Sequence, residues 1–502
     1  MVTFQPSLQE LQKQVEEQSP QFNLFPVCGM GLAESLTPNA AYLKLARPGS
    51  EKAEPSFLFE SAIAGEKLDR YSFIGVGPRK VIRTGNGHGP DVDPLVILEE
   101  ELKQFRQAKT PTMPLPSNSG GAIGYVSYDC IRYFEPKTAR DLKDPLGLPE
   151  AALMLFDTIV AFDNVYQRIQ VIHNVLVDSA DADLESLYNN ALKKIEAIFD
   201  TLRGPEYVLP QPKVTPNDQF ESNIGSKGYE DHVSRLKDHI HKGDIFQAVP
   251  SQRVAHPTQL HPFNIYRHLR TVNPSPYLIY IDYGDFQIVG ASPELLVKYD
   301  KGRVITHPIA GTLPRGRTSE EDDEMAAKLL SSSKDRAEHV MLVDLARNDI
   351  NRVCDPKTTN VDRLLTVERF SHVIHLVSQV SGVLREGKTR FDAFRSVFPA
   401  GTVSGAPKVR AMQLIGELEG ERRGVYAGAV GHWGYDEQDM NTCIALRTMV
   451  VKDGVAYLQA GGGIVYDSDP HDEFIETVNK LGSNSTTLRQ AEAIWAEKTK
   501  HL

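Results

Sequence analysis

Short apolar runs in the first half of the chain predict β-strands at 57–60, 71–76, 122–128, 158–162 and 168–177. Helical periodicity follows over residues 181–202, because apolar side chains recur there at the spacing of one helix face. The first half therefore consists mainly of strands and ends in a helix.

The second half mixes long helical patterns with further apolar runs. The expected helices are 320–346, 407–419 and 472–482. The expected strands are 245–253, 277–282, 287–291, 426–433, 442–451 and 455–459. These strands form antiparallel-looking groups and not alternating βαβ units, so the pattern predicts a large α+β fold. No G-x-G-x-x-G sequence follows a strand to indicate a dinucleotide site.

One stretch between the halves interrupts the pattern. Residues 204–225 contain four prolines, which disfavour helix and central strand. Ser226 can cap a new helix that runs to about His241. The sequence therefore predicts an N-terminal region at 1–204, a linker at 205–225 and a second domain at 226–490.

Charge limits the classes of partner. Lys and Arg number 55 and Asp and Glu number 66, which gives 502 residues a formal net charge of −11. Sequence-independent binding to nucleic acid and binding to an anionic membrane both need a basic surface, so no nucleic-acid or membrane partner is expected. An anionic substrate would need a local counter-charge.

The compartment follows from targeting signals and cysteines. No apolar run approaches the roughly 18 residues of a membrane span. Residues 1–20 lack the pattern of a secretory signal or an Arg-rich transit peptide. The four cysteines lie far apart and form no C-x-x-C pair, which argues against zinc and fits a reducing compartment. The expected location is cytoplasmic.

Three carboxylates form the strongest candidate site. Glu473 and Glu476 are three residues apart, and side chains at that spacing share one face of a helix. Glu338, in the run 335–340, is the third. Together they could hold a hard divalent cation, with water and substrate oxygens completing its coordination. On spacing alone, a solvated acidic helix face is the stronger alternative.

Glycine-containing segments suit a close approach of the backbone to a ligand. They are Gly311 with Thr312, the run 400–408, and the triplet Gly461, Gly462 and Gly463. The run 400–408 superficially resembles a phosphate loop but fails, because no Ser or Thr follows its lysine. The triplet could present N–H groups to a carboxylate. A tight turn explains each segment equally well when it is taken alone.

Three further residues could bind a carboxylate or transfer a proton. Arg447 lies in an apolar run expected as a strand, where it would pair with a carboxylate of either a substrate or the protein. His375 lies in another apolar segment. A histidine in such a segment is more often a hydrogen-bonded core residue, and the functional alternative is a group that transfers a proton. Glu294 precedes apolar residues; if it is partly buried, its raised pKa would suit an acid. A surface acid at a strand end is the alternative.

These segments occur together in one known family. Residues 335–351, 395–412 and 461–480 closely resemble the chorismate-utilising enzymes, and the resemblance covers about 225–488. Residues 59–62 (Phe-Glu-Ser-Ala) and 70–75 (Arg-Tyr-Ser-Phe-Ile-Gly) resemble the N-terminal region of anthranilate synthase component I. The resemblance implies a large, mostly antiparallel sheet sandwich with helices on the outside. It also implies a regulatory, tryptophan-binding N-terminal region and a chorismate-binding catalytic domain.

The family pattern implies a metal and a carboxylate site. Glu338 and Glu476 would bind Mg²⁺, with Glu473 in the shell, and the metal would hold the ring carboxylate of chorismate. The triplet Gly461, Gly462 and Gly463 would contact that carboxylate through N–H groups.

The same resemblance assigns the remaining candidates. Arg447 and Tyr426 would hold the enolpyruvyl carboxylate. Gly311 and Thr312 would line the ring. Glu294 would protonate the departing ring hydroxyl, and His375 would stand near the elimination chemistry.

Two positions separate the members of this family. Water-using members resemble one another in having a Lys where this chain has Gln247, which cannot deprotonate water and leaves ammonia as the nucleophile. Aminodeoxychorismate synthases often carry a Lys where this chain has Ala310. The resemblance therefore implies anthranilate synthase, a lyase of tryptophan biosynthesis that converts chorismate and ammonia to anthranilate and pyruvate. Aminodeoxychorismate synthase component I and a non-catalytic tryptophan-sensing subunit are the alternatives.

The family pattern also implies a protein partner. No cysteine lies in the G-x-C-x-G turn of glutamine amidotransferases. A separate glutamine amidotransferase subunit, component II, would then supply the ammonia within a hetero-oligomer.

Feedback inhibition by tryptophan is implied by a second set of residues. Glu60 could pair with the amino group of tryptophan, and Ser61 could hydrogen-bond it. The rest of the set is Asn273, Pro274, Ser275, Pro276, Tyr277 and Leu278. Leu278 stands where many bacterial relatives have Met, which leaves the strength of inhibition open.

Overall fold

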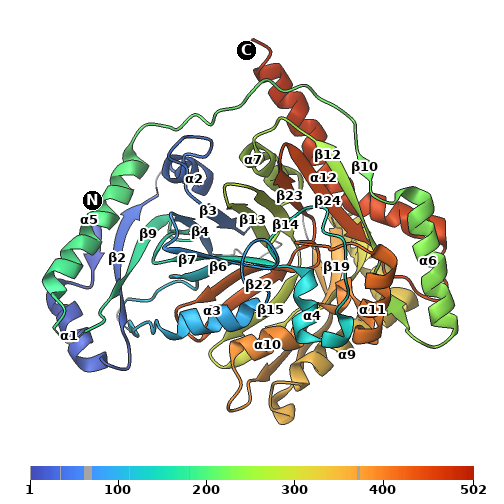
Figure 1. Cartoon of the computed structure of the whole chain (residues 1–502), viewed down its shortest axis with the longest axis horizontal. Helices are drawn as coiled ribbons and strands as arrows, with labels where there is room; N and C mark the ends of the chain where they lie inside the picture. The colour runs from blue at the N-terminus through green and yellow to red at the C-terminus, as the bar shows by residue number, and fades with distance from the viewer. Residues whose placement is uncertain are drawn as a thin grey trace.

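A computed structural model describes residues 2–33, 35–61, 70–111, 113–179, 181–369 and 373–501. Over this part of the chain, two large antiparallel sheets stack face to face and helices cover their outer faces (Figure 1). The sheets contain 12 and ten strands. The predicted α+β sandwich with helices on the outside is therefore confirmed.

The 12-stranded sheet contains strands from both halves of the chain. Its order is β1 (Thr3–Gln5), β2 (Leu24–Leu32), β9 (Arg168–Leu176), β8 (Thr158–Asp163), β4 (Tyr71–Val76), β3 (Ser56–Glu60), β13 (Tyr277–Asp282), β14 (Gln287–Ser292), β23 (Thr448–Lys452), β24 (Val455–Gly461), β12 (Ser251–Pro257) and β10 (Glu221–Ser222).

The ten-stranded sheet is mixed in the same way. Its order is β17 (Ile309–Pro314), β19 (Val373–Val383), β16 (Arg303–Thr306), β15 (Leu295–Asp300), β22 (Asp439–Ile444), β21 (Ala429–Gly434), β6 (Gly121–Val126), β7 (Ala151–Phe156) and β5 (Lys80–Thr84), and β18 (Asn360–Arg369) also pairs with β19. A separate short pair joins β11 (Gln247–Ala248) to β20 (Gly405–Ala406).

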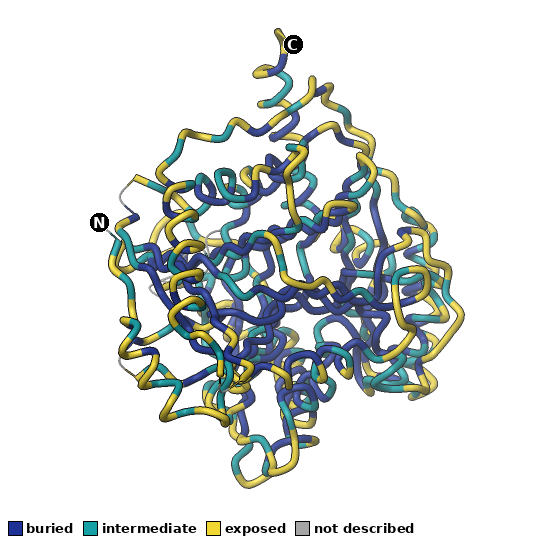
Figure 2. Tube along the Cα trace, turned by 60° about the vertical axis from the view of Figure 1, so that its left-hand side comes forward, coloured by how far each residue is buried: buried dark blue, intermediate teal, exposed yellow. Residues whose placement is uncertain are grey.

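Strand alternation explains the layers. Successive side chains of a strand point to opposite faces. In β13, Ile279 and Ile281 enter the core between the two sheets, whereas Leu278 and Tyr280 enter the core beneath the outer helices. Both faces of this strand are therefore buried, and Figure 2 shows the buried trace running through the middle of the molecule.

The helices fall into two groups. The outer face of the 12-stranded sheet is packed by α2 (Pro38–Ala46), α5 (Leu184–Arg203), α7 (Pro262–Val272) and α12 (Pro470–Lys498), with α1 (Leu8–Gln18) beside α5. The ten-stranded sheet is packed by α3 (Pro94–Lys103), α8 (Ser319–Ser331), α9 (Ser333–Asn351) and α10 (Arg390–Val397). The remaining helices of four or more residues are α4 (Ile131–Phe134), α6 (Gly225–His241) and α11 (Lys408–Glu419) in the described chain.

The two halves are joined by strand pairing. In the 12-stranded sheet β3 pairs with β13, and in the ten-stranded sheet β6 pairs with β21. After α5 the chain crosses the top of the molecule in irregular form to β10 and α6 (Figure 1). The domain limits at 204 and 226 stay a prediction, and each sheet contains strands from both sides of them.

Three predicted elements are wrong because each is interrupted within its expected range. The helix expected at 320–346 is two helices, α8 and α9, since Ser332 ends the first and its hydroxyl caps the second at Asp335. The strand expected at 442–451 is split into β22 and β23 at Arg447, whose φ is 48°. The strand expected at 245–253 is likewise divided into β11 and β12, with Pro250 between them.

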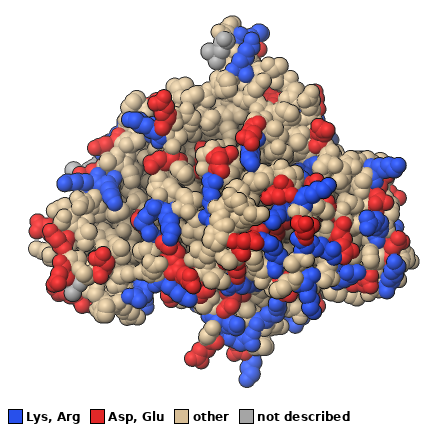
Figure 3. All heavy atoms as spheres, in the orientation of Figure 1, with Lys and Arg blue, Asp and Glu red and all other residues tan. Residues whose placement is uncertain are grey.

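Charged side chains of both signs are interspersed on the face shown in Figure 3. None of the helices in the described ranges is both long and apolar enough to cross a membrane.

Candidate active site

Glu294 lies between β14 and β15, where the chain passes from one large sheet to the other. The residue is 4% exposed, and the Thr402 hydroxyl donates to its Oε1 over 2.8 Å. Burial raises the pKa of Glu294 to about 8, although that hydrogen bond, a backbone donor at Ile309 and the charge of Arg447 all lower it. The carboxyl therefore keeps its proton at neutral pH and can give it to a leaving group.

His375 lies on β19 opposite Thr312 of β17. Its Nδ1 is 3.0 Å from Thr312 Oγ1 and 3.1 Å from the carbonyl oxygen of Gly311. Because a carbonyl can only accept, we assign the ring proton to Nδ1 and the lone pair to Nε2. Burial lowers the pKa of His375 to about 4, so the imidazole is neutral at physiological pH and can accept a proton.

A bulge in β17 brings Thr312 to His375. The register shifts between Ala310 and Thr312, and Gly311 between them has a φ of 73°. A Cβ on Gly311 would lie 3.0 Å from a methyl group of Leu329. Glycine thus satisfies both the left-handed backbone and the tight packing at this point.

Arg447 lies in the connection between β22 and β23, so its expected position inside a strand is wrong. Its left-handed φ of 48° is uncommon for a residue with a side chain, and strain of this kind clusters at functional sites. Burial lowers the pKa of the guanidinium, and the charge of Glu294 opposes this effect. Arg447 also acts on the titration of His375. The structure thus brings one cation close to the candidate acid and the candidate base.

The glycine triplet begins at the last residue of β24 and is closely packed. A Cβ on Gly461 would lie 2.3 Å from the Pro250 carbonyl oxygen, and one on Gly463 would lie 2.3 Å from Gln247 Nε2. The Gly462 N–H donates to Tyr229 Oη over 3.0 Å. The close approach, and not a positive φ, is what requires glycine here. Gly461 also borders the hydroxyl of Tyr426, whose pKa is raised to about 12 by burial.

The three candidate metal ligands come from two helices. Glu338 projects from α9, and Glu473 and Glu476 from the first turns of α12. Burial raises the pKa of Glu338, and the charge of Glu476 raises it further. Gln247 Nε2 donates to Glu338 Oε1 over 3.4 Å. These contacts place Gln247, Glu338 and Gly463 at one point of the site.

Glu473 and Glu476 differ in their partners. Glu473 Oε1 accepts from Ser468 Oγ over 2.6 Å, whereas its buried Oε2 has no hydrogen-bond partner. Glu476 forms an ion pair with Lys480 at 2.7 Å. Burial raises the pKa of Glu473, and the charge of Glu476 adds to that rise.

The charges and oxygen atoms of these three carboxylates suit the binding of a divalent cation. Mutual repulsion between Glu338 and Glu476 and an unpartnered oxygen on Glu473 are both relieved by a bound cation. Mg²⁺ commonly takes only one or two protein carboxylates and keeps several waters. Within the described ranges, no three Asp, Glu, His or Cys side chains lie close enough to hold a metal by themselves. Water and substrate oxygens would complete the coordination.

Comparison with known proteins defines the family. The sequence model of the chorismate binding enzymes matches residues 54–485. Anthranilate synthase component 1 of Saccharomyces cerevisiae is 64% identical over 495 residues, which cover 98% of this chain and 97% of that protein. The chain belongs to the anthranilate synthase component 1 family of chorismate binding enzymes. The family expected from the sequence, and the expected class of enzyme, a chorismate-utilising lyase, are confirmed.

Two further comparisons agree. The probable anthranilate synthase component 1 of Schizosaccharomyces pombe is 57% identical and covers 98% of both chains. The crystal structure of anthranilate synthase component I from Streptococcus pneumoniae has a TM-score of 0.74 at 38% identity, covering 91% of this chain and 99% of that one. The isochorismate synthase MenF of Escherichia coli shares the fold, with a TM-score of 0.69 at 18% identity.

Sequence reasoning on this family member missed two residues that the structure adds to the site. Thr402 contacts Glu294, and Lys480 contacts both Glu476 and the Gly461 carbonyl oxygen, at 3.1 Å for the latter. The spacing of Glu476 and Lys480, one helical turn apart, could have indicated the pair. Thr402 had no such signal, because its partner is distant in the sequence.

The run 400–408 has a structural explanation. Lys408 Nζ lies 2.6 Å from Asp349 Oδ2 in a largely buried ion pair, and it also donates to the Val397 carbonyl. Gly405 and Ala406 form β20 against β11, which carries Gln247. This loop therefore connects the Glu294 side of the site to the Gln247 side.

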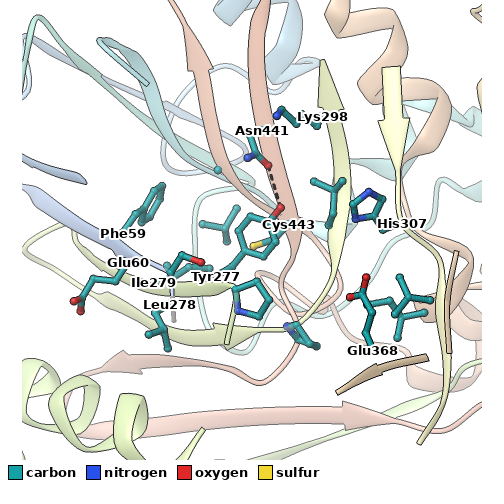
Figure 4. Close-up of a pocket in the computed structure, with 18 of the residues that line it drawn as sticks. Phe59, Glu60, Tyr277, Leu278, Ile279, Lys298, His307, Glu368, Asn441 and Cys443 are labelled. Carbon is teal, nitrogen blue, oxygen red and sulfur yellow. Dashed lines mark hydrogen bonds between the residues drawn. The ribbon is translucent and has the colours of Figure 1, made fainter. Parts of the chain in front are cut away.

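A second candidate site lies between the two sheets (Figure 4). A cavity of about 1090 Å³ is lined by Glu60 and Ser61 together with Pro276, Tyr277 and Leu278. Tyr277 crosses it, and its hydroxyl donates to Asn441 Oδ1 over 3.2 Å. Asn273, Pro274 and Ser275 precede β13 and do not line the cavity. The structure thus brings together five of the eight residues expected for tryptophan.

Glu60 is firmly held at one end of this cavity. Tyr266 Oη donates to its Oε2 over 2.6 Å, and Asn39 Nδ2 does so over 2.9 Å. Arg270 forms an ion pair with its Oε1 at 3.1 Å. The position of Glu60 is further fixed by pairing with Leu278 across β3 and β13. Of the matching segment, residues 62–69 lie outside the described residues.

Proposed function

We propose that this chain converts chorismate and ammonia to anthranilate and pyruvate. Support comes from the family membership and, above all, from one observation at the site. Burial leaves Glu294 protonated and His375 unprotonated at the same pH, and the charge of Arg447 acts on the pKa of both. A proton donor and a proton acceptor are what a reaction with a departing hydroxyl and a departing ring proton requires.

In the proposed first step, ammonia adds to C2 of chorismate while the C4 hydroxyl leaves as water. Glu294 gives its proton to the leaving oxygen. Gln247 cannot act as a base toward water, and its amide donates to Glu338. The absence of a base at position 247 agrees with ammonia, and not water, as the nucleophile.

In the second step the amino intermediate loses its C2 proton and pyruvate, and the ring becomes aromatic. His375 Nε2, which carries the lone pair, assists the removal of the proton. Thr312 and the Gly311 carbonyl hold the ring tautomer that this step needs.

Substrate binding is assigned to charges and to backbone. Arg447 and Tyr426 would hold the enolpyruvyl carboxylate, and the backbone of Gly461, Gly462 and Gly463 would border the ring carboxylate. Gly311 and Thr312 would line the ring. A dianionic substrate on a chain of net charge −11 depends on such local charge.

Glu338 and Glu476 would hold Mg²⁺, with Glu473 nearby. When bound, the metal neutralises the ring carboxylate and orients it.

Ammonia would come from a component II glutamine amidotransferase subunit in a hetero-oligomer. Tryptophan would inhibit by binding in the cavity lined by Glu60, Ser61, Pro276, Tyr277 and Leu278. Phe59 and Tyr277 offer aromatic surface there, and Glu60 offers a carboxylate for an amino group.

The test is fluorescence of the purified chain with chorismate, Mg²⁺ and an ammonium salt, with pyruvate assayed in parallel. Anthranilate and pyruvate should rise together, stop with a chelator and fall with tryptophan. Loss of chorismate without pyruvate would indicate aminodeoxychorismate. No loss of chorismate by a folded sample would refute the proposal.

A further inference from the structure

Thr402 is the side-chain donor to the candidate acid. Its hydroxyl lies 2.8 Å from Glu294 Oε1, and the backbone N–H of Ile309 is the other donor acting on this carboxyl. Arg447 is the charged group that acts on it. A hydroxyl can rotate, so it donates to an ionised carboxylate and can accept from a protonated one.

The loop that carries Thr402 is fixed from several sides. The Ser404 hydroxyl donates to the Ala400 carbonyl over 2.8 Å. Arg423 Nη1 donates to the Val403 carbonyl over 3.0 Å, and the buried Lys408–Asp349 ion pair anchors the end of the loop. These contacts restrict the backbone of the loop and so hold the Thr402 hydroxyl within hydrogen-bond distance of Glu294.

We infer that Thr402 is a positioning residue that holds the Glu294 carboxyl toward the leaving hydroxyl and stabilises its ionised form after the proton has been given. This inference rests on the proposed function, because Glu294 acts as the acid there. Thr402 would act through its contact with Glu294.

The hydrogen bond from Thr402 acts on the pKa of Glu294. Desolvation alone would raise the pKa of Glu294 further, and the Thr402 hydrogen bond opposes it. Removing the hydroxyl in Thr402→Val should therefore raise this pKa, and the activity that needs protonated Glu294 should persist to higher pH. Thr402→Ser keeps a hydroxyl and should behave as the unaltered chain.

The kinetic test compares kcat/KM of each variant with that of the unaltered chain at every pH. Taking the ratio cancels the ionisation of ammonium. For Thr402→Val the ratio should start well below one and rise by about tenfold across the alkaline limb, as a shift of ~1 pKa unit requires. Thr402→Ser, which keeps the hydroxyl, should give a ratio that does not change with pH.

The direct test is an infrared titration of the protonated carboxyl band that disappears in Glu294→Gln. Its midpoint should move up by about one pH unit in Thr402→Val and stay in place in Thr402→Ser. An unchanged midpoint in folded Thr402→Val would overturn the inference. The spectroscopic result stands even if the chain fails to consume chorismate, so the two proposals can fail separately.

Discussion

Glu60 and Glu294 are both buried glutamates, with 7% and 4% exposed surface, yet their surroundings are opposite. Glu60 forms an ion pair with Arg270 and accepts hydrogen bonds from Tyr266 and Asn39. Glu294 accepts a hydrogen bond from the Thr402 hydroxyl, and burial raises its pKa to about 8.

The difference follows from what each carboxyl would do. An acid in catalysis needs a proton to give, and at Glu294 burial outweighs the charge of Arg447 and keeps the carboxyl neutral. A carboxyl that binds an amino group needs its charge, so Glu60 is surrounded by donors. The same residue type would thus serve two chemistries because its neighbours differ.

Glu294→Gln gives the largest expected effect and tests the acid side of the comparison. The glutamine is nearly isosteric but has no acidic proton, so kcat should fall by about 10³-fold. Steady-state production of anthranilate measures the loss. A decrease of less than tenfold would show that Glu294 is not the acid.

The same variant tests the raised pKa through stability. A folded-state pKa of about 8 lies above the unfolded value near 4.5, so the unfolded chain binds fewer protons between these values. The unaltered chain should therefore lose stability as pH rises through this window, while Glu294→Gln should not show that contribution. Chemical denaturation of both chains from pH 5 to about 9 provides the comparison.

His375→Ala should come next, with a loss of about 10²-fold in anthranilate formation. The loss should fall on the elimination of pyruvate more than on amination, because His375 is the neutral imidazole assigned to the removal of the C2 proton. Chromatography of the products should then show an accumulated amino intermediate. Equal loss of both partial reactions would contradict the assignment.

Gly463→Ala tests the packing of the triplet. Its Cβ would lie 2.3 Å from Gln247 Nε2, so Gln247 and its partner Glu338 must move, and kcat/KM should drop by about tenfold to 100-fold. Gly482→Ala in α12 is the matched control, since nothing lies within 4 Å of its Cβ. The control should raise stability by up to ~1 kcal/mol, as Ala does in a helix interior.

Glu60→Gln has the smallest expected effect and tests the binding side of the comparison. Loss of the charge should raise the concentration of tryptophan that halves the activity by about tenfold. Dose–response curves of the two chains measure this change. Unaltered inhibition by tryptophan would place the inhibitor elsewhere.

The sequence predicted elements best where one pattern dominated. The strand at 277–282 was predicted with its observed limits, because apolar residues fill both of its faces. Arg447 and Ser332 show where such reasoning fails. A single left-handed residue and a single capping hydroxyl end elements that the apolar pattern alone would continue.

The candidate site was named from motifs, but its geometry could not be. Motif resemblance identified Glu294, His375 and Arg447, and the structure brings them together. The contact of Thr402 with Glu294 joins segments more than a hundred residues apart, and no local pattern encodes such a pair. The roles of these residues stay predictions until the variants above are measured.

The pairing of β3 with β13 and of β6 with β21 has a consequence for synthesis on the ribosome. When the first half has emerged, β3 and β6 still have unpaired edges, because their partners come from later parts of the chain. Exposed edges of this kind recruit other chains into aggregates. A nascent or truncated chain that ends after α5 should therefore depend on chaperones, and neither sheet can be completed until translation is nearly finished.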